Sequence, residues 1–240
     1  MAPSNEKLSA QGVRVAECIP LSGVRKMVAE HMTHSHVTVP AVTILEEWNV
    51  QAMVDLRTQL LQSSEPGAPG VSYTHIMVKA LAQALQQHRF LNATLAANEI
   101  QLLEEINIGV AVALPDGNLV VPVIRAADQK SITDIAAEAR LLADQARNGK
   151  LRLSDVRGAT FTLTNVGMIA DSRWQTPLVP TSQCAILATG AIREAPVVRN
   201  GAVVVGRVMS ASLTFDHRIV NGVPAALFLK TLGALLAGSN

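Results

Sequence analysis

The sequence predicts an α/β protein in which helices flank one mixed β-sheet. Runs rich in β-branched residues alternate irregularly with segments whose apolar residues recur every three or four positions. The chain of 240 residues is long enough for a substantial core, and 49% hydrophobic with 16% charged residues is typical of a folded domain. Aromatic residues make up 3% of the chain, so this core must be mainly aliphatic.

The first half of the chain is expected to hold three helices and one strand. Residues 1–18 are small and polar without a period, which predicts a flexible lead-in. In chain order, the elements expected after it are a helix capped by Ser22, a strand over 37–48, a helix through Met53, Leu56 and Leu60, a loop over 63–70 and a helix over 74–88.

The second half is expected to begin with a hairpin over 106–124, because two valine-rich runs flank the turn sequence Pro-Asp-Gly-Asn. Ser131, with Asp134 three residues later, predicts the start of a helix that ends at Gly149. The remaining expected elements are strands at about 159–164, 184–190 and 202–215, and a closing helix at about 222–237.

Charge and composition exclude several classes of protein. The net charge of +1 gives no reason to expect nucleic acid or an anionic membrane as the main partner. The chain has no apolar run of about 18 residues, and residues 1–20 do not have the pattern of a secretion signal. Cys18 and Cys184 lie far apart in unrelated contexts, so a reducing cytoplasm, or a mitochondrial matrix in a eukaryote, is expected.

The sharpest candidate for chemistry is the segment 212–222, SLTFDHRIVNG. An apolar strand ends there in Asp216-His217-Arg218, and a glycine and a helix follow. A histidine at a strand end can be presented into a cleft, and its usual pKa of about 6.5 suits proton transfer at neutral pH. A histidine that is merely hydrogen-bonded at a strand end gives the same pattern, and the local sequence alone favours that simpler interpretation.

A second candidate is the segment 158–167, GATFTLTNVG. Thr160, Thr162 and Thr164 alternate along a predicted strand, which puts three hydroxyl groups on one face. A hydroxyl near a strand end can donate a hydrogen bond to a developing oxyanion. Threonine is also simply common in strands, so the pattern alone does not assign this role.

Other reactive side chains give weaker signals. His31, His34 and His36 have the spacing HxxHxH, but no cysteine or nearby aspartate completes a ligand set and Glu30 would point elsewhere, so no metal is predicted. Cys184 lies in an apolar strand and is expected to be a core residue rather than a nucleophile. The absence of a Walker loop and of a GxGxxG motif gives no support for phosphoryl transfer or dinucleotide binding.

Six stretches, in order, resemble the catalytic domain of the 2-oxo acid dehydrogenase acyltransferases, the E2 components of those complexes. IPLSGVRKMVAEHM resembles the opening helix of the family, and VPAVTILEEWNV its first long strand. INIGVAVALPDGNLVVPVI resembles its hairpin, and KSITDIAAEARLLADQARNGKL the helix after it. GATFTLTNVGM resembles its hydroxyl-bearing strand, and SLTFDHRIVNG the segment with its active-site histidine. Residues 19–240 are therefore expected to form one acyltransferase catalytic domain.

The resemblance implies a chloramphenicol-acetyltransferase-like fold that forms homotrimers, which build cores of 24 or 60 chains. One subunit would provide His217 and its neighbour Thr164, at a position where the family has serine or threonine. Coenzyme A and the lipoyl arm would enter a channel from opposite ends. His217 would take the proton of a thiol, whose usual pKa is about 8.5, and Thr164 would donate to the oxyanion. The implied partners are a lipoyl domain and the dehydrogenase (E1) and dihydrolipoamide dehydrogenase (E3) components.

Two features depart from the family pattern. The usual motif is DHRxxDG, and this chain has Asn221 where the second aspartate stands. In the wider fold that aspartate is linked to an arginine of the opening helix, which Arg25 resembles, so an arginine–amide hydrogen bond is expected to replace an ion pair. Asp216 is expected to support His217 from the adjacent position. The lipoyl domain and the peripheral-subunit-binding domain of full-length members are absent from this sequence, so the lipoyl group is expected on another domain or chain.

The expected function is therefore transfer of an acyl group between the thiols of dihydrolipoamide and coenzyme A. Two alternatives remain open, namely acetylation of a small molecule by an acyl-coenzyme A on the same fold, and a structural core that has lost catalysis. A pure scaffold needs neither His217 nor Thr164, and the presence of both argues against it. The sequence does not distinguish an acetyl, a branched-chain or a succinyl group.

Overall fold

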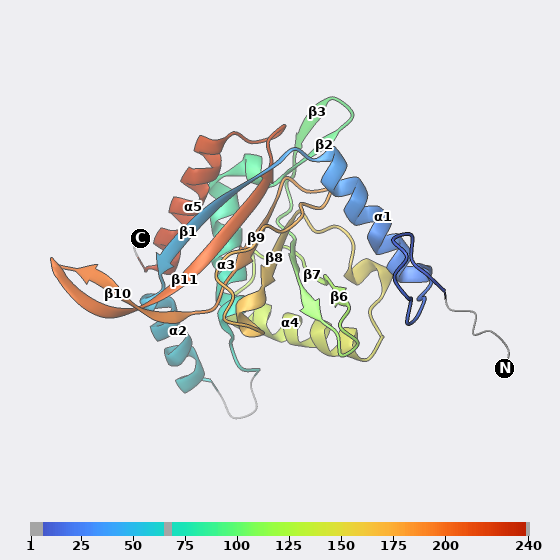
Figure 1. Cartoon of the computed structure of the whole chain (residues 1–240). Coiled ribbons are helices and arrows are strands. Elements are labelled where there is room, and N and C mark those ends of the chain that lie inside the picture. The colour runs from blue at the N-terminus through green and yellow to red at the C-terminus, as the bar shows by residue number, and fades with distance from the viewer. Residues whose placement is uncertain (1–6, 65–68, 239–240) are drawn as a thin grey trace.

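The computed structural model describes residues 7–64 and 69–238 and has a seven-stranded mixed sheet at its centre (Figure 1). The strand order is β1-β11-β9-β8-β4-β7, with β10 paired to β11. These strands are β1 (Ala41–Asn49), β4 (Ile108–Val110), β7 (Val123–Ile124), β8 (Phe161–Asn165), β9 (Ala185–Thr189), β10 (Arg193–Arg199) and β11 (Ala202–Asp216). The helices of the described chain are α1 (Gly23–Thr38), α2 (Gln51–Gln62), α3 (Tyr73–Gln87), α4 (Ile132–Arg147) and α5 (Gly222–Leu236).

The sheet is mixed because β8 runs parallel to both of its neighbours, β4 and β9, whereas the other pairs are antiparallel. The predicted α/β class with a mixed sheet and flanking helices is therefore confirmed. Two small hairpins lie outside this sheet. They are formed by β2 (Ala93–Ala96) with β3 (Glu99–Leu102), and by β5 (Val112–Ala113) with β6 (Leu119–Val120).

Helix starts follow their capping residues closely. The Ser131 side chain accepts from the backbone N–H of Asp134, and the Asp134 carboxylate accepts from the backbone N–H of Ser131, so the predicted capping box is formed. Gly149 after this helix has a φ of +64°, the left-handed conformation that favours glycine. Ser72 caps α3 in the same reciprocal way, with His75 in the third helical position.

The predicted strand over 37–48 starts too early. Helix α1 continues to Thr38, whose hydroxyl donates to the carbonyl of His34 at 2.7 Å, and β1 begins after Pro40, which cannot continue a helix. The strand β10 was not expected. It contains Pro196, and a proline marks a segment as an edge strand, which is the position β10 occupies.

The predicted hairpin over 106–124 forms but is interrupted. Its outer part is the separate pair β5–β6, and its inner part, β4–β7, belongs to the central sheet. The loop expected over 63–70 lies partly outside the described residues. The lead-in expected over 1–18 is likewise described from residue 7 onward.

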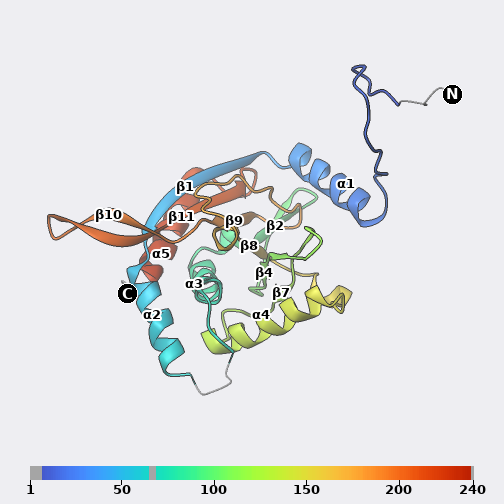
Figure 2. The ribbon, with the colours of Figure 1, turned by 60° about the horizontal axis from the view of Figure 1, so that its bottom comes forward.

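Strand β8 divides the hydrophobic core from the opposite side of the sheet. Phe161 and Leu163 are fully buried members of the main core, which α3 and α5 help to build. Because side chains alternate along a strand, the threonines between them point the other way. Figure 2 shows α1 and the segment before it at one side of this body, and Val24 and Met27 on that helix are 67% and 61% exposed. No described helix is long and apolar enough to cross a membrane.

Candidate active site

The three threonines of the hydroxyl-bearing strand share one cavity, as their alternation predicts. Thr160, Thr162 and Thr164 all line a cavity of about 1040 Å³. The walls come from α1, the segment after β3, strand β8 and the loop that precedes β9. A strand face rich in hydroxyl groups thus forms part of an otherwise largely apolar chamber.

Among these threonines, only Thr164 has a hydroxyl without a hydrogen bond to residues 7–64 and 69–238. The Thr160 hydroxyl accepts from the backbone N–H of Asn107 at 3.1 Å, and the Thr162 hydroxyl donates to the side-chain carbonyl of Gln183 at 2.8 Å. The side chain of Thr164 is half-buried in the cavity wall. It is therefore the hydroxyl available to a bound ligand.

His217 follows the last residue of β11 and has an exposed side chain. Its backbone N–H donates to the carbonyl of Pro40 at 3.1 Å, and the neighbouring N–H of Asp216 donates to the carbonyl of Cys184 at 2.8 Å. The imidazole lies near the ring of Phe215, with centroids 5.8 Å apart and ring planes tilted by 31°. A fixed backbone and an apolar neighbour thus present the imidazole at the end of β11, on the surface of the single chain.

An ion pair holds the turn around this histidine. Arg218 donates from Nε to Oδ1 of Asp216 at 3.0 Å and from Nη2 to Oδ2 at 2.6 Å. Its backbone N–H also donates to Oδ1, at 2.9 Å. The Asp216 side chain is 3% exposed and that of Arg218 is 41% exposed. Hydrogen bonding to Asp216 raises the pKa of Arg218, and the charge of the carboxylate adds to this effect.

Asn221 and Arg25 do not meet within one chain. Asn221 is the N-cap residue of α5, but its exposed side chain makes no capping hydrogen bond. Arg25 is exposed in the first turn of α1 and forms no hydrogen bond or ion pair within the described residues. Asp216, five residues before Asn221, pairs with Ala41 at the start of β1, beyond the C-terminal end of α1, and α1 is about 24 Å long. The expected arginine–amide hydrogen bond is thus absent from the single subunit.

Thr164 and His217 also lie apart in one chain. Thr164 is level with Ala188 on β9, which is level with Ser212 on β11. His217 follows Ser212 by five residues, or about 17 Å, and β11 is two strand spacings, or about 10 Å, from β8. The separation is roughly 19 Å on this geometry, which is too far for both side chains to act on one thioester.

The remaining candidates from the sequence are the histidines of α1 and Cys184. Within residues 7–64 and 69–238, no group of three or more histidine, cysteine, aspartate or glutamate side chains is placed to hold a metal ion. His31 lines the cavity, whereas His34 and His36 are exposed on α1. Cys184 is fully buried, and burial, followed by the charge of Asp216, raises the pKa of its thiol to about 12. Its prediction as a core residue rather than a nucleophile is confirmed.

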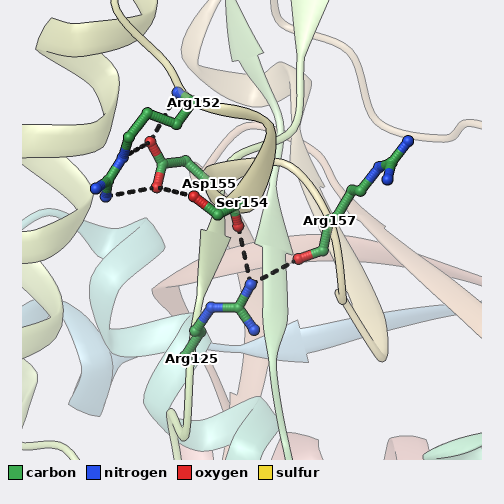
Figure 3. Close-up of polar contacts among 5 residues, drawn as sticks. All are labelled: Arg125, Arg152, Ser154, Asp155 and Arg157. Atoms are coloured by element: carbon green, nitrogen blue, oxygen red, sulfur yellow. Dashed lines mark hydrogen bonds and ion pairs between the residues drawn. The ribbon is translucent and has the colours of Figure 1, made fainter.

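One end of the cavity has features that sequence reasoning missed. The loop 152–158 carries Arg157 and Gly158 into the cavity wall, and Arg125 from the segment after β7 holds this loop by its carbonyl groups (Figure 3). Lys150, Arg152 and Arg157 within KLRLSDVRG form a local excess of positive charge in the sequence. Their different roles depend on Arg125, which is distant in the sequence.

One protein family matches nearly the whole chain. Residues 14–240 match the model of the 2-oxoacid dehydrogenases acyltransferase (catalytic domain) family. The chain belongs to this family. Among curated members, the dihydrolipoyllysine-residue acetyltransferase component of the pyruvate dehydrogenase complex of Bacillus subtilis (strain 168) is 37% identical over 218 residues, which are 90% of this chain and 49% of the relative. The chain spans about half the length of the curated relatives it matches.

Solved structures of acyltransferases in this family superpose closely. One is Azotobacter vinelandii dihydrolipoamide acetyltransferase (E2p), with a TM-score of 0.89 and 33% identity, covering 95% of this chain and 93% of that one. That structure belongs to an investigation of the role of a serine, a histidine and an asparagine in its catalytic mechanism, the asparagine four residues after the histidine. Asn221 follows His217 by the same interval.

Two further solved structures have a similar fold. The cubic core of a pyruvate dehydrogenase multienzyme complex matches with a TM-score of 0.88 and 33% identity, covering 95% of this chain and 93% of that one. A chloramphenicol acetyltransferase matches with a TM-score of 0.56 and 15% identity, over 92% of this chain and 99% of that one. The predicted chloramphenicol-acetyltransferase-like fold is therefore confirmed.

Proposed function

We propose that this chain is a dihydrolipoyl acyltransferase that moves an acyl group between a lipoyl thiol and coenzyme A. The observation that carries this proposal is the unengaged hydroxyl of Thr164 in the cavity of an acyltransferase-family fold. The hydroxyl groups of Thr160 and Thr162 are committed to other residues, whereas Thr164 is free to donate. The relatives at 37% identity are acetyltransferase components, which favours acetyl among the acyl groups left open by the sequence.

The complete site requires two copies of the chain. Thr164 and His217 are roughly 19 Å apart in one copy on strand geometry, so the base must come from a neighbouring subunit if the two act together. Exposed apolar residues on α1, such as Val24 and Met27, provide surface for such an association. A homotrimer gives each Thr164 one partner His217, and assembly of trimers into a 24-chain core follows the cubic-core relative.

The chemistry needs one base and one hydrogen-bond donor. The His217 imidazole accepts the S–H proton of coenzyme A, and the resulting thiolate attacks the carbonyl carbon of the acyl-lipoyl thioester. Thr164 donates a hydrogen bond to the tetrahedral oxyanion. The carbon–sulfur bond to the lipoyl group then breaks, and His217 returns the proton to the departing lipoyl sulfur. The products are acyl-coenzyme A and dihydrolipoamide, and the reverse reaction uses the same groups.

Asn221 serves this site as an amide, without the charge of an aspartate. The Azotobacter enzyme has an asparagine of mechanistic interest at the same interval from its histidine, which supports a working site in this chain. Because Arg25 has no partner among the described residues of its own chain, the neighbouring subunit is where its guanidinium can meet an acceptor. Asn221 is therefore assigned to support of His217 within its own chain, and Arg25 to a contact across the subunit boundary.

The working partners follow from the reaction. Acyl-lipoyl groups must reach the cavity on a lipoyl domain, borne by another part of the protein or by another chain. A dehydrogenase (E1) component loads the lipoyl group, and a dihydrolipoamide dehydrogenase (E3) component reoxidises it. A reducing cellular interior, as expected from the two separated cysteines, keeps the thiols of both substrates available.

Acetyl transfer from acetyl-coenzyme A to free dihydrolipoamide tests this function, followed by thioester absorbance. We expect activity in the wild type and a loss of about 10²–10⁴-fold in His217→Ala. Absence of activity in a correctly assembled wild type would exclude the acyltransferase and favour the scaffold. Activity toward a small-molecule amine or alcohol, with none toward dihydrolipoamide, would favour the other alternative.

A further inference from the structure

The last residue of β8 is held from behind by helix α3. Asn165 follows Thr164, and because side chains alternate along a strand, its amide lies on the core face while the Thr164 hydroxyl faces the cavity. Nδ2 of Asn165 donates to the hydroxyl oxygen of Thr74 at 3.1 Å. Thr74 lies in the first turn of α3 and is 8% exposed. A hydrogen bond between residues 91 positions apart thus ties the end of the strand to a buried helix.

The same hydroxyl also contacts the turn that follows β8. The Thr74 hydroxyl donates to Sδ of Met168 at 3.5 Å. Met168 ends the short 3-10 helix η3 (Val166–Met168), whose N-cap residue is Asn165. A hydroxyl group can donate and accept at the same time, so Thr74 serves both the amide and the sulfur. Removal of this hydroxyl would therefore release the end of the strand together with the turn after it.

A second contact holds this turn from the side of β9. Gly167 lies against the backbone of Gly190, the residue after β9, and a Cβ atom on Gly167 would overlap the carbonyl carbon of Gly190. The N–H of Gly190 donates to the carbonyl of Ser210 on β11 at 2.9 Å. The end of β8 is therefore enclosed between α3 and a backbone segment that is itself fixed, which leaves it little room to shift.

The Asn165 amide contributes little to stability for a buried group. Its Oδ1 atom is buried without a hydrogen-bond partner in residues 7–64 and 69–238, and the same holds for Oγ1 of Thr189. The two residues are level on the parallel strands β8 and β9, and by alternation they share the core face with Leu163 and Leu187. Both atoms are closed to solvent within one chain, so a neighbouring subunit cannot supply the missing partners. A leucine of similar size avoids the cost of the unsatisfied carbonyl, so the fold alone does not require an amide here.

The position of the Thr164 hydroxyl depends on the direction of this strand end. Thr164 has no side-chain hydrogen bond within the described residues, so the backbone alone sets its direction. Adjacent residues on opposite faces of a strand turn together, so a rotation that releases the Asn165 amide also tilts the Thr164 hydroxyl. An oxyanion donor acts over about 2.7–3.1 Å, and a misplacement of about 1 Å reduces the rate strongly.

We infer that Asn165 is a positioning residue for Thr164, and that Thr74 holds the Asn165 amide behind the strand so that the Thr164 hydroxyl points at the reacting carbonyl group. This inference rests on the proposed acyl transfer and deepens it. Neither Asn165 nor Thr74 is on the cavity wall, so both act through Thr164 rather than on the substrates. Their contacts lie inside one chain and hold in a single subunit as well as in an assembly.

The test is a double-mutant cycle in acetyl transfer from acetyl-coenzyme A to free dihydrolipoamide. Asn165→Leu should lower kcat about tenfold and leave KM for both substrates within about twofold of the wild type, because a donor is misplaced and no binding contact is lost. Thr164→Ala has no hydroxyl to misplace, so adding Asn165→Leu to it should alter kcat by less than about twofold.

Thr74 provides a second, independent variant. Thr74→Val keeps the shape but removes the hydroxyl, and it should lower kcat about fivefold alone and by less than about twofold when added to Thr164→Ala. Thr74→Ser keeps a hydroxyl and should recover most of the activity lost in Thr74→Val. The matched control is Thr231→Val, which removes a hydrogen bond at the other end of α3, where Oγ1 of Thr231 lies 2.8 Å from Nε2 of His88. Its kcat should stay close to that of the wild type.

Three outcomes would overturn the inference. One is a loss of the same size from Asn165→Leu with and without Thr164→Ala, since Asn165 would then act independently of the hydroxyl. Another is an unchanged kcat in Asn165→Leu. The third is a loss of kcat that follows a lowered urea midpoint, in Thr231→Val as in Asn165→Leu, whereas we expect the Asn165→Leu midpoint within about 0.5 M of the wild type.

Two features keep the test decisive. If Asn165→Leu does not assemble, the cycle with Thr74→Val is judged by the same criteria. Activity of the wild type is measured first, so failure of the proposed acyl transfer is recognised separately from failure of the positioning role.

Discussion

Arg218 and Asp216 form a two-pronged ion pair across His217, the residue between them in the sequence. Both carboxylate oxygens of Asp216 accept from the Arg218 guanidinium, at 2.6 to 3.1 Å. The backbone carbonyl of Asp216 also accepts from the N–H groups of Ile219 and Val220, at 3.0 and 3.1 Å. A buried carboxylate therefore fixes the turn on which the imidazole is carried, and it does so without contact to the cavity.

We expect Asp216→Asn to lower kcat by about a hundredfold while KM changes little, because a misplaced base loses rate more than binding. The mutant loses the charge of a buried pair, so its free energy of unfolding should fall as well. Steady-state kinetics over a range of pH separates the two effects. If the base is only displaced, the plot of kcat against pH should keep its shape and its apparent pKa values, with lower kcat throughout. Unchanged kcat in a folded mutant would show that the ion pair does not position His217.

Thr164→Ala should lower kcat by about 10²–10³-fold, because an oxyanion loses its donor. Thr164→Ser keeps the hydroxyl and should stay near the wild type. His217→Ala is expected to cost more than Thr164→Ala, since base catalysis of thiol attack is lost entirely. Thr162→Val is the matched control on the same strand face, with its hydroxyl engaged by Gln183. Equal losses in the Thr162 and Thr164 variants would remove the special role of Thr164.

Asn221→Asp should change kcat by less than about threefold, because asparagine and aspartate have nearly the same shape and both accept hydrogen bonds. The same acetyl-transfer assay measures this. Asn221→Ala, which removes the group, should lower the activity clearly. A large rise in Asn221→Asp would mean instead that the natural asparagine impairs the site.

The stability of the fold should fall in mild acid because of His75. Its Nδ1 accepts from the backbone N–H of Ser72 at 3.1 Å, and burial lowers its pKa from 6.5 to about 4. Below pH 6.5 the unfolded chain binds a proton that the folded chain does not, so the free energy of unfolding drops as pH falls toward 4. The loss between pH 7 and pH 5 should be on the order of 2 kcal/mol.

Urea denaturation at pH 7 and pH 5 checks this prediction. His75→Gln keeps a side chain that can accept at the helix start but does not titrate, so its stability should vary less between the two pH values. If the mutant and the wild type lose the same stability, His75 is not the group responsible.

Elements that are determined by a few neighbouring residues were predicted correctly from the sequence. Ser131 and Asp134 predicted the start of α4, and the alternation of Thr160, Thr162 and Thr164 predicted one shared face. The helix after Ser22 was predicted, but its extension to Thr38 was missed because β-branched residues favour a strand locally. A hydrogen bond from the Thr38 hydroxyl to His34 and the following Pro40 decide the boundary. Intrinsic preference was overruled there by a contact one turn away.

The candidate site depended on long-range information. A strand-end histidine alone has an ordinary interpretation, and the resemblance over residues 19–240 gave His217 its expected role. The sequence could not indicate that Gln183 engages Thr162 while Thr164 stays free, because this depends on the pairing of distant segments. The same holds for Arg125, whose reach to the loop 152–158 exists only in the folded chain.

The most direct measurement is acetyl transfer by mixed assemblies of two inactive variants, His217→Ala and Thr164→Ala, refolded together in equal amounts. If neighbouring subunits share each site, an intact His217 of one variant meets an intact Thr164 of the other at about one interface in four, so activity should recover to roughly a quarter of the wild type. Recovery to this level would establish acyl transfer at a shared site. Activity no higher than that of the two variants measured separately would contradict it.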